Sequence, residues 1–254
     1  MNRIDDYMKL TTDIVGWLCK YINDNNLKSF VVGVSGGIDS AVTSTLAAKT
    51  GLPVYAVGMP LSTKIEQETL SDAHLFWLSQ NYPNVKVLKT DLSETFAKFI
   101  NDLSSDLEVE YTSNPLAKAN SKSRLRMMTL YHIAGNVGGI VVGTGNKVED
   151  YGIGFYTKYG DGGVDIAPIA DLYKTEVREL GGFMGVIPEI LDAKPTDGLW
   201  EDDRTDEDQI GASYEQLEEA METGTGPAVD ILYNFNKQNR HKMEPIPTFK
   251  LGES

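Results

Sequence analysis

The sequence predicts an α/β fold, a doubly wound and mostly parallel sheet with helices on both faces. Two observations lead to this prediction. Short apolar runs rich in β-branched residues alternate with segments whose apolar residues recur every three to four positions, the pattern of βαβ units. The first run, 30–34, ends at the adjacent glycines Gly36 and Gly37, and a helix is expected to begin directly after them. Ligands of such open sheets bind outside the carboxyl ends of the strands, so we expect a site at this turn.

The elements follow in the order that this winding requires. Apolar periodicity predicts an N-terminal amphipathic helix over 4–22. Strands are predicted at 30–34, 53–58, 85–88 and 140–142, and helices at 39–47, 66–80, 92–103 and 117–136. Further along, the pattern predicts a polar loop over 155–176, helices at 172–185, 188–191, 214–221 and 229–238, and a tail that contains 239–242. The acidic segment 201–208 is expected to form a mobile surface flap anchored by Trp200.

Composition narrows the class of protein. The chain has 254 residues, 41% hydrophobic and 24% charged, and we expect one domain over 1–254. No apolar run approaches the roughly 20 residues of a membrane span. The net charge of −14 argues against nucleic acid as a partner. A single cysteine, Cys19, excludes an intramolecular disulfide and, with three histidines, leaves no Cys/His zinc site, which fits a cytoplasmic protein.

The glycine turn after the first strand is suited to binding an anion. Strand, turn and helix N-terminus together present backbone N–H groups to a ligand. The spacing is neither that of a Walker A loop, because no lysine is present, nor that of a dinucleotide-binding G-x-G-x-x-G turn. Asp39 is placed to hold Mg²⁺, so the loop is better suited to a pyrophosphate that leaves than to a transferred γ-phosphate. A glycine turn without a ligand is the alternative.

The motif Ser35-Gly36-Gly37-Ile38-Asp39-Ser40 resembles the S-G-G-x-D-S loop of the ATP pyrophosphatases, a Rossmann-like family that cleaves ATP between the α and β phosphates. This resemblance implies ATP contacts at Gly33, Val34, Ser35, Gly36, Gly37, Ile38, Asp39 and Ser40. It also implies a second glycine-rich strand exit, where Thr144 contacts ATP and Glu149 shares a Mg²⁺ with Asp39. On spacing alone Glu149 would be a surface residue.

Later motifs are similar to those of NAD synthetases. They are the arginine-containing helix Ser123-Arg124-Leu125-Arg126-Met127, the loop T-K-Y-G-D-G-G-V-D at 157–165 with a lysine-bearing helix start, a P-T-D-G-L-W segment at 195–200 and a His-Lys pair. The resemblance implies deamido-NAD contacts at Arg124, Lys158, Asp165, His241 and Lys242, and ATP contacts at Lys174 and Thr196. From the residues alone, Arg124 and His241 would be solvent-facing, and Asp161 has no implied role.

The resemblance implies an enzyme, a carbon–nitrogen ligase that converts deamido-NAD, ATP and ammonia into NAD, AMP and pyrophosphate. The substrate carboxylate would attack ATP, so no nucleophilic serine or cysteine is needed. Mg²⁺ on Asp39 and Glu149, with Lys174, would stabilise the charge on the leaving pyrophosphate. Asp161 is a candidate to take a proton from ammonium. The chain has no N-terminal cysteine and no room for a glutaminase domain, so free ammonia, or ammonia from a separate subunit, is the expected nitrogen donor. The family also implies a homodimer.

Two alternatives stay open at this point. Another amide-forming ATP pyrophosphatase, such as a GMP synthetase core, would share the first loop, and only the loop from Lys158 to Asp165 argues against it. A nucleotide-binding module without turnover would also need a strand, a glycine turn and a helix. It would not need Asp39, Glu149 and Lys174 together.

Overall fold

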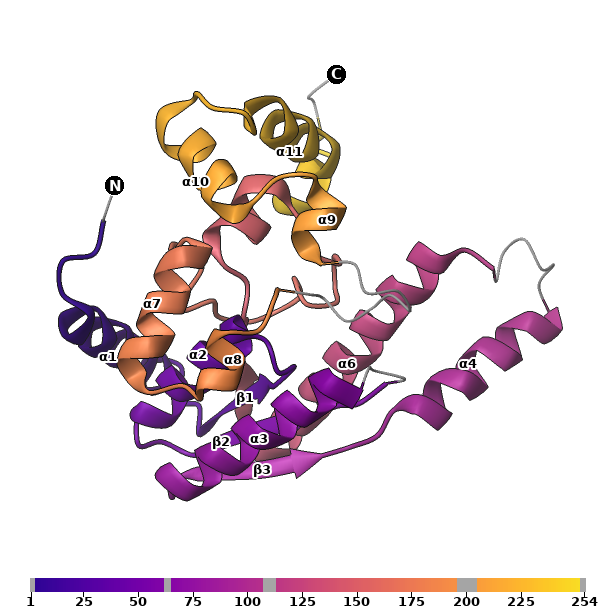
Figure 1. The fold of residues 1–254 in the computed structure, drawn as a ribbon. Helices are drawn as coiled ribbons and strands as arrows, with labels where there is room; N and C mark the ends of the chain where they lie inside the picture. The colour runs from indigo at the N-terminus through magenta and orange to yellow at the C-terminus, as the bar shows by residue number, and fades with distance from the viewer. Residues whose placement is uncertain (1–2, 62–64, 107–112, 196–204, 252–254) are drawn as a thin grey trace.

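The computed structural model describes residues 3–61, 65–106, 113–195 and 205–251. Its centre is a four-stranded sheet in the order β3-β2-β1-β4 (Figure 1). The strands are β1 (Ser29–Gly33), β2 (Val54–Gly58), β3 (Val85–Lys89) and β4 (Gly139–Val141). Every pairing in this sheet is parallel, with Phe30 opposite Val54 and Ile140. The predicted fold class is therefore confirmed.

Helices cover both faces of the sheet. The first part of the chain contains α1 (Tyr7–Asp24), α2 (Ile38–Lys49), α3 (Ile65–Asn81), α4 (Ser93–Asp106) and α6 (Pro115–Val137). After β4 follow a π-helix η1 (Lys147–Ile153), α7 (Lys174–Met184), α8 (Pro188–Leu191), α9 (Asp206–Ile210), α10 (Tyr214–Thr223) and α11 (Val229–Met243). Within the described residues no helix has both the length and the apolar character needed to cross a membrane.

Side chains along β1 alternate between two apolar clusters, one on each face of the sheet. Phe30, Val31 and Val32 are fully buried, as expected of a strand covered on both faces. Phe30 and Val32 belong to an apolar cluster with α1, α2 and α7, whereas Val31 packs with residues of α4 and α6 on the other face. Burial on both faces fixes the register, because a slip of one residue would exchange the two sets of side chains.

The C-terminal helices build a separate apolar cluster. Val148 and Ile153 of η1 pack with Tyr173, with Leu217 of α10 and with residues of α11. Figure 1 shows α9, α10 and α11 grouped together above the sheet, at the top of the view. Both η1 and α10 lie close to the turn after β1, because Asn146 at the start of η1 contacts Asp39, and Tyr214 of α10 contacts Glu149 of η1.

Four differences between the predicted and the observed elements concern predicted site residues. The strand exit after 142 continues into the π-helix η1, which the apolar spacing did not indicate. Helix α7 begins at Lys174, two residues later than expected, so Lys174 lies at a helix N-terminus. The C-terminal part of the expected flap forms the short helix α9, while residues 196–204, with Thr196 and Trp200, lie outside the described residues. The expected tail at 239–242 is the last part of α11.

A buried histidine between α2 and α3 makes the stability of the fold sensitive to acid. His74 has no exposed surface, its Nε2 lies 3.0 Å from Ser44 Oγ, and burial lowers its pKa to about 4. The folded state therefore keeps this imidazole neutral, and its contribution is complete above the unfolded pKa of about 6.5 and is lost as the pH falls toward 4.

We expect the free energy of unfolding of the wild type to fall by about 2 kcal/mol more than that of His74→Gln between pH 7 and pH 5. Urea unfolding at the two pH values measures this difference, and acidic groups common to both proteins cancel. Equal losses in the two proteins would contradict the prediction.

Candidate active site

The loop after β1 is held open by its own serines. Ser40 Oγ accepts a hydrogen bond from Ser35 N at 3.1 Å and donates one to the carbonyl of Gly37 at 2.9 Å. Ser35 Oγ accepts from Gly37 N at 3.2 Å. Gly36 has a φ of 92°, a conformation that side chains rarely adopt, so glycine is required there. The loop is thus fixed before any ligand arrives, with the N-terminus of α2 directed at the space above it.

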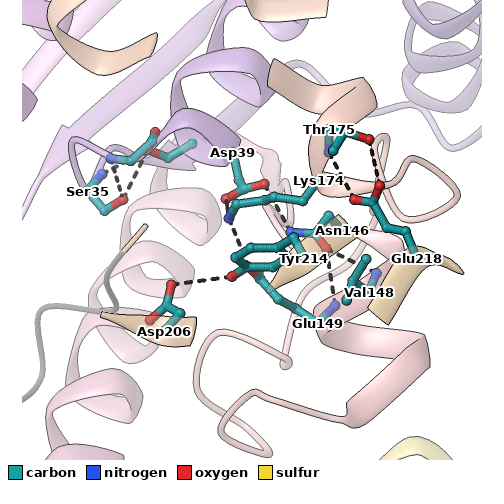
Figure 2. A network of polar contacts seen from close by, with 12 residues as sticks. Ser35, Asp39, Asn146, Val148, Glu149, Lys174, Thr175, Asp206, Tyr214 and Glu218 are labelled. Carbon is teal, nitrogen blue, oxygen red and sulfur yellow. Dashed lines mark hydrogen bonds and ion pairs between the residues drawn. The ribbon is translucent and has the colours of Figure 1, made fainter. Parts of the chain in front are cut away.

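Three charged side chains from three separate elements meet next to this loop (Figure 2). Lys174 Nζ lies 2.5 Å from Asp39 Oδ2 and 2.8 Å from Glu149 Oε1. Asp39 stands in the first turn of α2, Glu149 in η1 and Lys174 at the start of α7. The structure therefore brings together the three residues that were predicted to hold Mg²⁺ and to contact the ATP phosphates.

Burial and mutual attraction set the charges of this group. Burial alone would lower the pKa of Lys174, but the charges of Asp39 and Glu149 raise it well above its ordinary value. Burial raises the pKa of Asp39, against the attraction of Lys174. For Glu149 burial acts in the same direction, but Lys174 and hydrogen bonds from Lys174 and Tyr214 lower its pKa below the ordinary value. Lys174 stays protonated across the neutral range.

Asn146 connects the two glycine-rich strand exits and was missed in the sequence. Its side chain has no exposed surface, and its Nδ2 donates to Asp39 Oδ1 at 3.1 Å. Its Oδ1 accepts from the backbone N–H groups of Val148 and Glu149, both at 3.1 Å, so that it caps η1. An asparagine just before an acidic first turn is a helix-cap signal that could have identified it.

Removing this amide should affect catalysis and stability together. We expect Asn146→Ala to lower the free energy of unfolding by about 1–2 kcal/mol, because a helix cap is lost, and to lower kcat because Asp39 is released. The matched control is Asn114→Ala, which removes the cap that accepts from Ala117 N at 3.1 Å on α6, outside the site. Steady-state kinetics with urea unfolding separates the two effects. A kcat unchanged in both variants would contradict the assigned role.

Two side chains of α10, Tyr214 and Glu218, contact the charged group and its neighbour Thr175. Tyr214 Oη donates to Glu149 Oε1 at 2.6 Å, and its ring lies 4.9 Å from Lys174 Nζ. Glu218 accepts from Thr175 N at 3.1 Å and from Thr175 Oγ1 at 2.7 Å. Neither residue was singled out in the sequence, where both belong to an ordinary amphipathic helix.

A cavity of about 290 Å³ opens above these residues. Predicted site residues from four separate segments line it. They are Gly33, Val34, Ser35, Gly36, Gly37, Ile38, Asp39, Ser40, Thr144, Glu149, Asp161 and Lys174. Four cationic side chains also reach it that were not predicted as site residues: Lys89, Arg126, Arg178 and Lys194. The predicted ATP contacts that the structure describes thus share one cavity with both predicted metal ligands.

Asp161 lies on the wall of this cavity, where the glycine-rich loop crosses α6. Its Oδ1 accepts from Ser123 Oγ at 2.7 Å and from Thr157 N at 3.0 Å. Asp161 is an exposed residue at this wall, and partial desolvation of its carboxylate raises its pKa, against the hydrogen bonds from Ser123 and Thr157.

A second cavity of about 520 Å³ adjoins the first, and Asp150 and Val164 line both. Its walls include four aromatic rings, those of Trp17, Tyr21, Tyr151 and Tyr156, and two predicted substrate residues, Asp165 and Lys242. Asp150 was missed in the sequence. Burial, and then the charge of Glu149, raise its pKa well above the ordinary value.

The two predicted substrate residues at the second cavity, Asp165 and Lys242, also make hydrogen bonds within the protein. Asp165 Oδ2 accepts from Val141 N at 2.8 Å and Oδ1 from Tyr131 Oη at 2.9 Å, so this carboxylate also holds the edge of the sheet. Lys242 Nζ donates to the carbonyls of Gly154 at 2.6 Å and Tyr156 at 2.8 Å.

The other three predicted substrate residues lie close to one another but line neither cavity. Arg124 Nε donates to the carbonyl of Lys158 at 3.1 Å, and Lys158 Nζ donates to the carbonyl of His241 at 3.2 Å. Five residues predicted to bind one substrate are thus divided between the second cavity and its surroundings.

The donor set at Asp39 and Glu149 fits a metal that arrives with a nucleotide. Among the described residues, no group of three or more His, Cys, Asp or Glu side chains could hold a metal alone. Mg²⁺ is commonly bound by one or two carboxylates while substrate phosphates and waters complete its shell. Two carboxylates beside a phosphate-binding loop meet that requirement.

Comparison with known proteins agrees with this site. The chain matches the family model described as NAD synthase over residues 10–247. It is 37% identical to the NH(3)-dependent NAD(+) synthetase of Carboxydothermus hydrogenoformans, over 91% of this chain and 93% of that protein. It resembles the structure of NMN synthetase from Francisella tularensis with a TM-score of 0.86 and 31% identity, over 98% of this chain and 100% of that one. For NAD+ synthetase from Burkholderia pseudomallei the TM-score is 0.73 and the identity is 25%, over 94% of this chain and 90% of that one. The chain therefore belongs to the NAD synthase family.

Proposed function

We propose that the protein is an ammonia-dependent NAD synthetase, which amidates deamido-NAD with ATP and releases AMP and pyrophosphate. The observation that carries this proposal is Lys174 between Asp39 and Glu149, at the wall of a cavity formed by the glycine turn. The choice of ammonia as nitrogen donor and of NAD as product follows the names of its relatives. Family membership favours this reaction over a GMP synthetase core or a module that only binds nucleotide.

In the first step the substrate carboxylate attacks the α-phosphorus of ATP. A new bond forms between a carboxylate oxygen and this phosphorus, the bond to the bridging oxygen breaks, and pyrophosphate leaves with the electron pair. Backbone N–H groups of the turn at 35–40 and the ammonium of Lys174 stabilise the charge that grows on the departing phosphates. When bound, Mg²⁺ on Asp39 and Glu149 would supply further neutralisation of that charge.

In the second step ammonia attacks the acyl carbon of the adenylate. The carbon–nitrogen bond forms, the bond to the AMP oxygen breaks and its electron pair leaves with AMP, and the nitrogen releases a proton to water. Ammonium is not nucleophilic, so a group near the reacting carbon must accept its proton. Asp161 is suited to this role because it faces the cavity and its pKa is raised, which makes it a better proton acceptor than an ordinary aspartate.

The second cavity is the proposed site for the nicotinate end of the substrate. Four aromatic rings offer stacking surfaces to a planar pyridine ring, and the cavity shares Asp150 and Val164 with the ATP cavity. A carboxylate held there is adjacent to ATP, as the first step requires. Arg124, Lys158, Asp165, His241 and Lys242 surround this region and remain the proposed contacts to the rest of the dinucleotide.

We further propose that the protein works as a homodimer in the cytoplasm, with one domain over 1–254. Large apolar side chains are exposed on α4 and α6, including Phe99 (45%), Leu116 (56%) and Met128 (64%). Figure 1 shows these two helices projecting away from the rest of the chain. Contact with a second copy would cover such a surface.

A mononucleotide is a second candidate substrate. The TM-score to an NMN synthetase is 0.86, against 0.73 to an NAD+ synthetase of similar coverage. The chemistry would be unchanged, because nicotinate mononucleotide carries the same carboxylate as deamido-NAD. Only the adenylyl half of the dinucleotide, which does not react, would be absent.

One assay distinguishes these functions. The protein is incubated with ATP, Mg²⁺ and ammonium and with deamido-NAD, nicotinate mononucleotide or xanthosine monophosphate, and NAD, NMN, GMP and AMP are quantified. We expect the highest kcat/KM with deamido-NAD, with AMP equal to NAD, and no NAD when glutamine replaces ammonium. A higher kcat/KM for the mononucleotide would assign the second candidate. AMP release without formation of NAD or NMN, or no AMP release with any acceptor, would reject the proposed reaction.

A further inference from the structure

Tyr214 is the buried aromatic residue that touches the charged group at the cavity wall. Its exposure is 4%, its hydroxyl donates to Glu149 Oε1 at 2.6 Å, and its ring lies 4.9 Å from the Lys174 ammonium (Figure 2). Burial and then the charge of Glu149 raise its pKa, so the hydroxyl keeps its proton and remains a donor. A cation above the ring and a carboxylate at the hydroxyl are both favourable for a tyrosine in this orientation.

The backbone of Tyr214 is held in place independently of the charged group. Ser213 caps α10 by accepting from Gln216 N, and Tyr214 N donates to Glu207 Oε1 at 3.0 Å. Glu218, one turn later on α10, holds both the backbone N–H and the hydroxyl of Thr175, the neighbour of Lys174. Helix α10 is thus tied to the start of α7, and the backbone of Tyr214 is held without Lys174 or Glu149. The Tyr214 hydroxyl also lies 3.5 Å from Asp206 Oδ2.

One carboxylate oxygen receives two hydrogen bonds in this arrangement. Glu149 Oε1 accepts from Lys174 Nζ at 2.8 Å and from Tyr214 Oη at 2.6 Å. Under the proposed function the ammonium of Lys174 must turn from Glu149 toward phosphate when ATP binds. Glu149 Oε1 would then lose one of its two donors, and the tyrosine hydroxyl would keep its hydrogen bond to this oxygen and hold the carboxylate beside Asp39.

We propose that Tyr214 is a positioning residue of the reaction: from α10 it holds Glu149 in place for Mg²⁺ while Lys174 moves to the phosphates of ATP. This inference rests on the proposed function. Tyr214 lines neither cavity and acts through Glu149 and Lys174. Replacement of its hydroxyl should therefore affect metal binding and kcat, and leave the KM for the dinucleotide unchanged.

The test compares Tyr214→Phe with a matched variant, Tyr7→Phe. Tyr7 Oη also donates to a glutamate, Glu179, at 2.5 Å, but on the exposed surface between α1 and α7. For Tyr214→Phe we expect kcat to fall about tenfold or more, since a hydrogen bond to a charged group is lost, with the KM for deamido-NAD within twofold of the wild type. Mn²⁺ binding in the presence of α,β-methylene-ATP, measured by electron paramagnetic resonance, should weaken about tenfold. Tyr7→Phe should match the wild type in all three measurements.

A double-mutant cycle shows whether Tyr214 acts through Glu149. In a Glu149→Gln background, Tyr214→Phe should change Mn²⁺ binding and kcat less than twofold, because the carboxylate is already absent. Full additivity of the two substitutions would overturn the proposal. So would Tyr214→Phe with wild-type kcat and Mn²⁺ binding, or with a lowered melting temperature as its only change. A wild type that makes no NAD would instead reject the proposed function, and the Mn²⁺ measurement would still test Tyr214.

Discussion

Lys174→Met is expected to lower kcat about 100- to 1,000-fold, the usual cost of removing one charged group that stabilises a transition state. Methionine has nearly the length of lysine but cannot stabilise the charge on departing pyrophosphate. AMP release with saturating ATP, ammonium and deamido-NAD measures the effect. The matched control is Lys147→Met, because Lys147 Nζ also contacts a carboxylate, Asp171 at 2.7 Å, and lies 5.1 Å from the ring of Tyr173. A kcat within tenfold of the wild type would contradict the role of Lys174.

The same variant should gain affinity for a divalent cation in the absence of ATP. In the wild type the Lys174 ammonium contacts both Asp39 and Glu149, so a metal must compete with it. Without the lysine, two largely buried carboxylates remain unpaired, which destabilises the fold. Millimolar Mg²⁺ should then raise the melting temperature of Lys174→Met by more than that of the wild type or of Lys147→Met, because the ion binds the folded state. Equal shifts in all three proteins would show that these carboxylates do not bind the metal.

Asp39→Asn is expected to lower the rate of AMP release at least 100-fold. Asparagine keeps the size of the side chain and can still accept the hydrogen bond from Asn146, but its amide cannot neutralise Lys174 or hold a metal as a carboxylate does. The loss should appear in kcat with every acceptor substrate, because Asp39 acts on ATP. Asp171→Asn, which removes the exposed partner of Lys147, serves as the control. Substantial AMP release by Asp39→Asn would contradict the assignment.

Much of the fold follows from local pattern. The buried strand 30–34, its glycine turn and the helix after it are adjacent in sequence, and their apolar spacing is unambiguous. Helix α11 shows where such reasoning fails. None of its residues is buried, and its last residues are polar and basic, so the apolar pattern ended before the helix did. The π-helix η1 escaped prediction because its hydrogen-bond spacing leaves no regular periodicity in seven residues.

The site residues also fall into those that local sequence reveals and those that it does not. Asp39 was identified from its place in a contiguous motif, while Glu149 and Lys174 were assigned only by family resemblance, because spacing alone gave no sign that they meet. Tyr214 and Asn146 were missed for a physical reason. Tyr214 reaches Glu149 across 65 positions in the chain and Asn146 reaches Asp39 across 107, and these contacts arise only from the packing of α10 and η1 above the sheet.

The oxygen atoms of the substrate show whether an adenylate forms. Deamido-NAD labelled with ¹⁸O at both carboxylate oxygens is converted with ATP, Mg²⁺ and ammonium, and the products are analysed by mass spectrometry. If the carboxylate attacks the α-phosphorus, one ¹⁸O appears in the phosphate of AMP, one remains in the amide of NAD, and pyrophosphate carries none. Label in pyrophosphate or inorganic phosphate, or NAD formed with unlabelled AMP, would contradict an adenylate and with it the role assigned to Asp39, Glu149 and Lys174.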